Sequence, residues 1–142
     1  MQYKSIPEYS NISSTQFFQQ IVVKQKPIVI RDFAQRWPLV ASAKKGPNQF
    51  VNYLNRFYRG TKTGMVVAPP AANKRFAYNQ DISDFNFIRG EERLDLFLGR
   101  LLELIDRDIY PAISMQGASI SDILPGLAKD NRSDFLTKTE PR

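Results

Sequence analysis

The 142-residue sequence contains neither cysteine nor histidine. Without cysteine the chain can form no disulfide and no thiolate metal site, a composition that fits a cytoplasmic protein. Without histidine, and without a Gly-x-Ser-x-Gly segment, a catalytic triad lacks both its usual base and its structural frame. The composition therefore excludes the common nucleophilic hydrolases and removes every usual iron or zinc ligand except scattered carboxylates.

The sequence also lacks long apolar segments, and we expect no secretory leader. No apolar run approaches the ~20 residues that a membrane-spanning helix requires. Met1 is followed by polar Gln2, Tyr3 and Lys4 rather than by a basic and then apolar segment. The content of 42% hydrophobic and 24% charged residues is typical of a soluble globular domain. We therefore expect residues 1–142 to form one domain or part of one, with no membrane partner.

Dense runs of one charge are missing as well, although the charge is unevenly distributed. Residues 1–80 carry +10, and residues 81–142 carry −4, within a net charge of +6. A basic half can attract nucleic acid or another anionic partner. The positive residues are scattered, however, and no run exceeds Lys44-Lys45. We interpret the asymmetry as complementarity between the halves or with an acidic segment further on, and expect no nucleic-acid partner.

Hydrophobic periodicity predicts three helices, over Thr15 to about Lys24, Asn48 to Tyr58 and Glu91 to Asp106. The third has the most regular apolar face, formed by Leu94, Phe97, Leu98, Leu101, Leu102 and Ile105. Glu91 and Glu92 would lie at the helix N-terminus, which favours negative charge, so we interpret them as solvated capping residues rather than as a general acid and base.

Short apolar runs predict strands at Pro27–Ile30, Met65–Ala68 and Ile109–Gln116. The first run is apolar throughout, so we expect it to be covered on both faces. Alternation predicts a half-exposed strand at Arg75–Tyr78, and Ser119 is expected to cap a short helix.

Aromatic residues between these elements are expected to be buried. We interpret Trp37 as a side chain that plugs the core rather than as a platform for a ligand. Phe85 and Phe87, in an irregular turn region after residue 80, are expected to be buried anchors.

Three segments are similar, in order and spacing, to segments of a known family. They are Pro27–Pro38 (P-I-V-I-R-D-F-A-Q-R-W-P), R-F-A-Y-N at Arg75–Asn79 with Phe85-Asn86-Phe87, and Tyr110–Leu127 with its L-P-G-L turn. Over roughly Phe17–Leu136 the chain resembles the cupin-like, JmjC-related iron(II)/2-oxoglutarate oxygenases. The resemblance implies an α+β fold that contributes the N-terminal helices and outer strands of a double-stranded β-helix.

The family's iron site, a His-x-Asp/Glu pair and a later His, has no counterpart in this sequence. The chain ends at Arg142, about where the family continues into the strand that leads to the first ligand. We therefore expect an N-terminal portion without a metal site, and we assign no catalytic or cofactor-binding residue. Iron(II), 2-oxoglutarate and hydroxylation or demethylation of a protein or small molecule are implied only for a complete member.

The resemblance also suggests a weak candidate substrate cleft, since the family's equivalent segment borders the active-site mouth. Its candidate residues are Tyr78, Asn79, Phe85, Phe87 and Gln116. Core packing and turn capping explain the first four equally well. Gln116 either points into a barrel mouth or satisfies a backbone group.

A second hypothesis is a metal-free binding or structural module that meets an acidic partner or nucleic acid through its basic first half. Under the oxygenase hypothesis, the predicted strands would leave sheet edges unpaired. Unpaired apolar edges promote association, so we expect homo-oligomers or marginal stability for these residues alone.

Overall fold

The computed structural model describes residues 5–132, which contain five strands and several short helices. The strands are β1 (Glu8–Tyr9), β2 (Val29–Ile30), β3 (Lys62–Ala68), β4 (Ile88–Arg93) and β5 (Ala112–Met115). The α-helices are α1 (Ser14–Gln16), α2 (Pro38–Lys44), α3 (Pro47–Asn55), α4 (Leu94–Leu104), α5 (Ile120–Ile123) and α6 (Leu127–Asp130). Three further segments are helical but not α-helical: η1 (Phe17–Ile21) is a π-helix, and η2 (Val22–Lys24) and η3 (Pro70–Ala72) are 3-10 helices.

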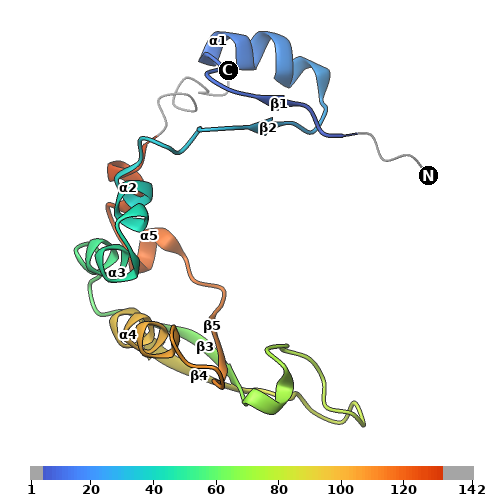
Figure 1. The fold of residues 1–142 in the computed structure, drawn as a ribbon, viewed down its shortest axis with the longest axis vertical. Helices are drawn as coiled ribbons and strands as arrows, with labels where there is room; N and C mark the ends of the chain where they lie inside the picture. The colour runs from blue at the N-terminus through green and yellow to red at the C-terminus, as the bar shows by residue number, and fades with distance from the viewer. Residues whose placement is uncertain (1–4, 133–142) are drawn as a thin grey trace.

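The N-terminal unit, residues 5–30, lies at one end of an arc-shaped molecule (Figure 1). In it β1 and β2 pair in parallel, and the helical turns from α1 to η2 connect them. The Arg31 guanidinium reinforces the pairing by binding the Glu8 carboxylate at 2.6 Å. The predicted helix and strand are thus confirmed, with the strand shortened to Val29–Ile30. The expectation that this strand is covered on both faces is wrong, because Val29 and Ile30 are only half-buried.

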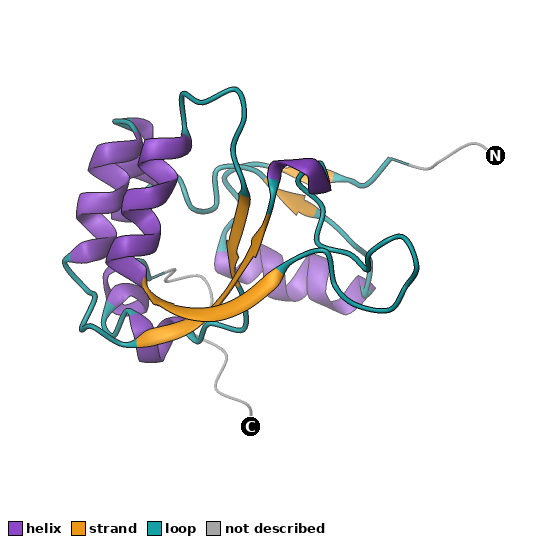
Figure 2. Ribbon diagram, turned by 90° about the horizontal axis from the view of Figure 1, so that it is seen from below, coloured by secondary structure: helices purple, strands orange, loops and turns teal. Residues whose placement is uncertain are grey.

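The main core joins the helices to a three-stranded sheet. Figure 2 shows the helices of this body gathered beside the strands. The buried cluster consists of Val51, Tyr53, Leu54, Met65, Leu94, Phe97, Leu98, Ile123, Leu124 and Leu127. The apolar faces of α3 and α4, predicted from periodicity, supply most of these side chains, because burying such a face stabilises a short helix.

The sheet is antiparallel, in the order β4-β3-β5. The pairing of β3 with β4 runs from Lys62↔Arg93 to Val67↔Ile88. The pairing of β3 with β5 runs from Met65↔Met115 to Ala68↔Ala112. Within residues 5–132 the outer edges of β4 and β5 have no strand partner, and the strands close no barrel. The fold is therefore α+β with an incomplete barrel, as predicted.

Two local predictions are wrong around β4. The helix predicted from Glu91 begins only at Leu94, and both Glu91 and Glu92 belong to the strand instead of capping the helix. The physical reason is the long-range pairing with β3, which satisfies the backbone of an otherwise highly charged segment. The predicted strand at Arg75–Tyr78 is also wrong, because its only strand-like contact is the isolated bridge Tyr78↔Phe85.

Two short helices, α2 and α6, were not predicted. Pro38 occupies the first turn of α2, where its missing N–H costs nothing. The backbone N–H of Leu39, in the same turn, donates to the side chain of Asn131 just after α6. Each helix is too short to be stable alone, so its formation depends on tertiary contacts such as this one and the packing of Leu39 and Leu127 on the core.

Candidate functional site

The candidate site is a hairpin, residues 75–87, that projects beyond the end of the sheet between β3 and β4 (Figure 1). The Asn86 N–H donates to the Ala77 carbonyl at 2.9 Å, and the Asn79 N–H donates to the Asp84 carbonyl at 2.8 Å. Four of the five predicted cleft residues lie in this hairpin.

Two asparagine side chains fix the shape of the hairpin. The Asn86 Oδ1 accepts from the Ala77 N–H at 2.9 Å, and its Nδ2 donates to the Arg75 carbonyl at 3.1 Å. Nearer the tip, the Asn79 Nδ2 donates to Ser83 Oγ at 3.1 Å, and its Oδ1 accepts from the Asp84 N–H at 3.3 Å. Asn79 therefore caps the turn.

The aromatic side chains of the hairpin form a ladder, Tyr78–Phe85–Phe87–Phe76. Tyr78 and Phe85 stack at a centroid distance of 4.9 Å and an angle of 24°, and Phe85 lies 4.8 Å from Phe87. Phe76 meets Phe87 edge-on at 5.6 Å. The Arg89 guanidinium lies 4.6 Å from the centroid of Phe85, which adds a cation–π contact.

The ladder is more exposed than predicted. Tyr78 is 58% exposed and Phe85 37%, whereas Phe87 is half-buried. The expectation that Phe85 is a buried anchor is therefore wrong, because stacking on Tyr78 and Arg89 replaces burial in the core. An exposed aromatic ring that is held in place by neighbouring rings can stack on a planar or apolar group of a partner.

An apolar groove of about 470 Å³ lies at the foot of the hairpin. It is lined by Val67, Pro69, Asp84, Phe85, Asn86, Phe87 and Ile88. Phe85 and Phe87 are thus the predicted cleft residues that face a groove. Asp84 supplies its only carboxylate, whose Oδ1 accepts from the Phe85 N–H at 2.7 Å. The groove can hold an apolar group and offers one acidic acceptor at its rim.

The second carboxylate of the hairpin lies at its tip, outside this lining. The Ser83 hydroxyl donates to Asp81 Oδ1 at 2.8 Å. Hydrogen bonds from that hydroxyl and from the Ser83 N–H lower the pKa of Asp81, so its carboxylate remains charged at neutral pH.

Gln116 lies away from the other four predicted residues. Its backbone N–H donates to the Gly64 carbonyl at 3.2 Å, near the start of β3. The hairpin begins past Ala68, at the opposite end of that strand. The Gln116 side chain is exposed and donates to Ser114 Oγ at 3.5 Å. The structure therefore does not bring Gln116 to the groove.

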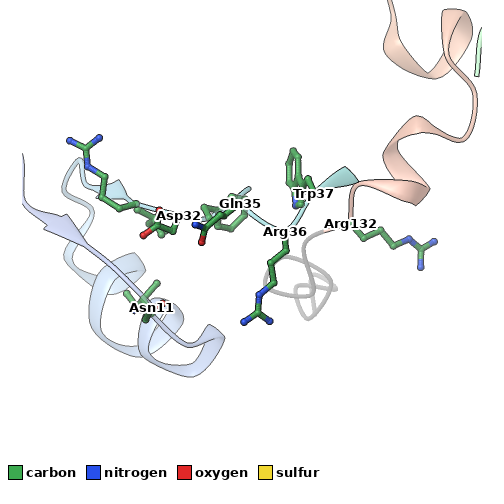
Figure 3. A pocket seen from close by; sticks show the side chains of 10 residues that line it. Asn11, Asp32, Gln35, Arg36, Trp37 and Arg132 are labelled. Carbon is green, nitrogen blue, oxygen red and sulfur yellow. The ribbon is translucent and has the colours of Figure 1, made fainter. Parts of the chain in front are cut away.

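A separate hollow of about 290 Å³ lies between the N-terminal unit and the end of α6, and includes Trp37 and Arg132 (Figure 3). Trp37 is half-buried and meets Phe33 at 6.0 Å, so the prediction that it plugs the core is wrong. Arg36 and Arg132 point in different directions, so they do not converge on one anion (Figure 3).

The donor set does not fit an iron site. The sequence has no histidine, and residues 5–132 bring together no group of three acidic side chains that could hold a metal ion. The two-histidine, one-carboxylate geometry of the oxygenases thus has no candidate ligands in this part of the chain. In the same part, no helix combines the length and the apolar character needed to cross a membrane.

Comparison with known families identifies the class of the fold. Residues 14–141 match the model of the cupin-like domain. The match spans nearly the whole sequence, and the chain therefore belongs to the cupin-like domain family. No curated protein matches the sequence.

Proposed function

We propose that this chain is the N-terminal part of a JmjC-type oxygenase that depends on iron(II) and 2-oxoglutarate. The main observation in support is that the two outer edges of the sheet β4-β3-β5 have no strand partner among residues 5–132, as in a barrel that is incomplete. Membership of the cupin-like domain family supports the proposal, since that family includes the JmjC oxygenases. The iron ligands would come from residues other than these, and the chain by itself would be inactive.

In this proposal, the described residues supply one wall of the barrel and part of its rim. The helices α3 and α4 pack on β3 and hold the wall in place. The hairpin and its groove would border the substrate entrance, where Phe85 and Phe87 contact an apolar part of a protein or small-molecule substrate.

The reading frame beyond Arg142 provides the first test. We expect it to encode a His-x-Asp/Glu pair within a few tens of residues. A reading frame without such a pair would contradict the proposal.

The second test compares that longer polypeptide with residues 1–142. Both are incubated with iron(II) and 2-oxoglutarate, and succinate is measured. We expect succinate only from the longer polypeptide. Failure of the longer polypeptide to bind iron or form succinate would favour a metal-free binding module.

A further inference from the structure

The outer edge of β5 is the best-formed pairing surface left open in the described part of the chain. In an antiparallel ladder, residue pairs that exchange both backbone hydrogen bonds alternate with pairs that exchange none. The bond from the Gln116 N–H to the Gly64 carbonyl, 3.2 Å, places Gln116 in a bonded position. Ser114 and Ala112 then also bond to β3, and Ile113 and Met115 direct their N–H and C=O groups outward.

The charge pattern distinguishes this edge from the opposite one. No residue from Ile109 to Ser121 is charged. The β4 edge carries charged side chains, which native sheets use to protect exposed edges. Several are already engaged: Glu92 binds Arg100 at 3.2 Å, and Arg93 binds Asp95 at 2.6 Å. The edge that lacks this protection is β5.

Apolar surface continues from β5 onto α4. A hollow of about 400 Å³ beside the strand is lined mainly by apolar side chains, among them Leu101, Leu104, Ile105, Ala112 and Ile113, and Lys74 is the one charged residue in its lining. Leu101 and Ile105 are exposed. A partner at β5 must therefore offer an uncharged strand with an apolar surface next to it.

We propose that this partner is a second copy of the chain, whose β5 pairs antiparallel with β5 across a two-fold axis at Ser114. Two copies offer each other the same uncharged strand and the same apolar helix face, as an isologous interface requires. The outward backbone groups restrict the register, and only a two-fold axis at Ser114 uses all of them, because Ile113 and the partner's Met115 then exchange hydrogen bonds. Ser114 then faces the partner's Ser114 in the close, non-bonded pair.

The resulting sheet has six strands, with both α4 helices on one face. In this register the apolar side chains of Ile113 and Met115 remain on the face that packs against α4. The pairing is proposed for residues 1–142 by themselves and rests on no part of the oxygenase chemistry. In the longer polypeptide of the proposed function a further barrel strand would take the β5 edge, so the tests below use residues 1–142 alone.

Cross-linking tests the register directly. The chain has no cysteine, so Ser114→Cys introduces a single thiol. Facing residues of a close antiparallel pair are near enough to form a disulfide. Mild oxidation of Ser114→Cys should give a covalent dimer, whereas the control Glu91→Cys on the β4 edge should stay monomeric in a denaturing gel. Equal cross-linking of both variants, or of neither, would overturn the proposal.

Charge substitution supplies a second, independent measurement. Sedimentation should show a dimer of the unmodified chain at micromolar concentration. Ser114→Lys and Ser114→Asp should each raise its dissociation constant about fivefold or more, because like charges would face each other. Mixing the two variants should restore the dimer, which misfolding could not do. A monomeric unmodified chain, or a mixture without recovery, would refute the pairing.

Discussion

The side-chain oxygen of Asn131 accepts a hydrogen bond from the backbone N–H of Leu39 at 2.9 Å, although 92 residues separate them. Leu39 lies in the first turn of α2, where N–H groups have no partner within the helix. The Asn131 Nδ2 donates to the Tyr53 hydroxyl at 2.8 Å and to the Leu127 carbonyl at 2.9 Å. One buried amide thus joins α2, α3 and α6.

Replacing this amide should destabilise the fold. Asn131→Ala leaves the Leu39 N–H without its acceptor in a partly buried position, and we expect a loss of about 1–3 kcal/mol in the free energy of unfolding. Urea denaturation measures the loss. The control is Asn52→Ala, on the exposed side of α3, which should change stability by less than about 0.5 kcal/mol. Equal effects of the two substitutions would contradict the capping role of Asn131.

The Tyr53 hydroxyl should make stability depend on alkaline pH. Burial, together with the 2.6 Å hydrogen bond that the hydroxyl donates to Asp130, raises the pKa of Tyr53. Below the unfolded-state pKa of about 10, both states hold the proton. Above it the unfolded state loses the proton first, so the free energy of unfolding falls as pH rises from about 10 through the folded-state pKa.

Tyr53→Phe removes this titration. Urea denaturation of both proteins at pH 9 and at higher pH values should show that the difference in stability between them shrinks with rising pH. A constant difference across this range would mean that the pKa of Tyr53 is the same in the folded and unfolded states.

The elements that could be predicted from the sequence are those with a local signal. The apolar face of α4 and the β-branched run in β3 both carry their pattern within a few residues. The charged segment of β4 carries none, because its conformation comes from hydrogen bonds to a strand some 25 residues earlier in the chain. The short helix α2 likewise has a distant partner, since its first turn is capped by Asn131.

In the candidate site, too, the residues placed by local structure could be predicted, and the residue placed by long-range pairing could not. Tyr78, Asn79, Phe85 and Phe87 are close together because one local hairpin holds them. The position of Gln116 depends on the register of β5 against β3, which tertiary packing sets and periodicity does not reveal. Arg89, which supports the ladder, was missed because a lone arginine after an aromatic pair gives no distinctive pattern.

The hairpin tip contains a strained residue whose replacement should stabilise the protein. Ile82 has φ of 62°, in the left-handed region that β-branched residues disfavour. Ile82→Gly should raise the free energy of unfolding by about 1 kcal/mol, because glycine adopts this conformation without strain. Ile88→Gly is the matched control, since both isoleucines are 72% exposed and Ile88 lies in a strand. It should lower stability by about 0.5–1 kcal/mol, and a loss from both substitutions would argue against strain at Ile82.

The purified chain should hold no stoichiometric transition metal. The sequence offers neither imidazole nor thiolate, and residues 5–132 cluster no three carboxylates. Elemental analysis after dialysis against a weak chelator provides the measurement. One retained iron per chain would mean that ligands other than those of the known oxygenase site are in use.

Binding of the chain to nucleic acid should be weak, independent of sequence and strongly dependent on salt. Residues 1–80 carry a charge of +10, which attracts phosphate at low ionic strength. Several of these cations already have partners within the chain, however. Arg31 binds Glu8, the Arg56 guanidinium lies 5.6 Å from the Tyr53 ring centroid, and the Lys74 Nζ lies 2.8 Å from the Tyr110 hydroxyl.

Fluorescence anisotropy with two unrelated duplexes, at low and at physiological salt, should give similar affinities that fall steeply as salt rises. Submicromolar affinity for one duplex alone at physiological salt would instead identify the basic half as a specific nucleic-acid surface.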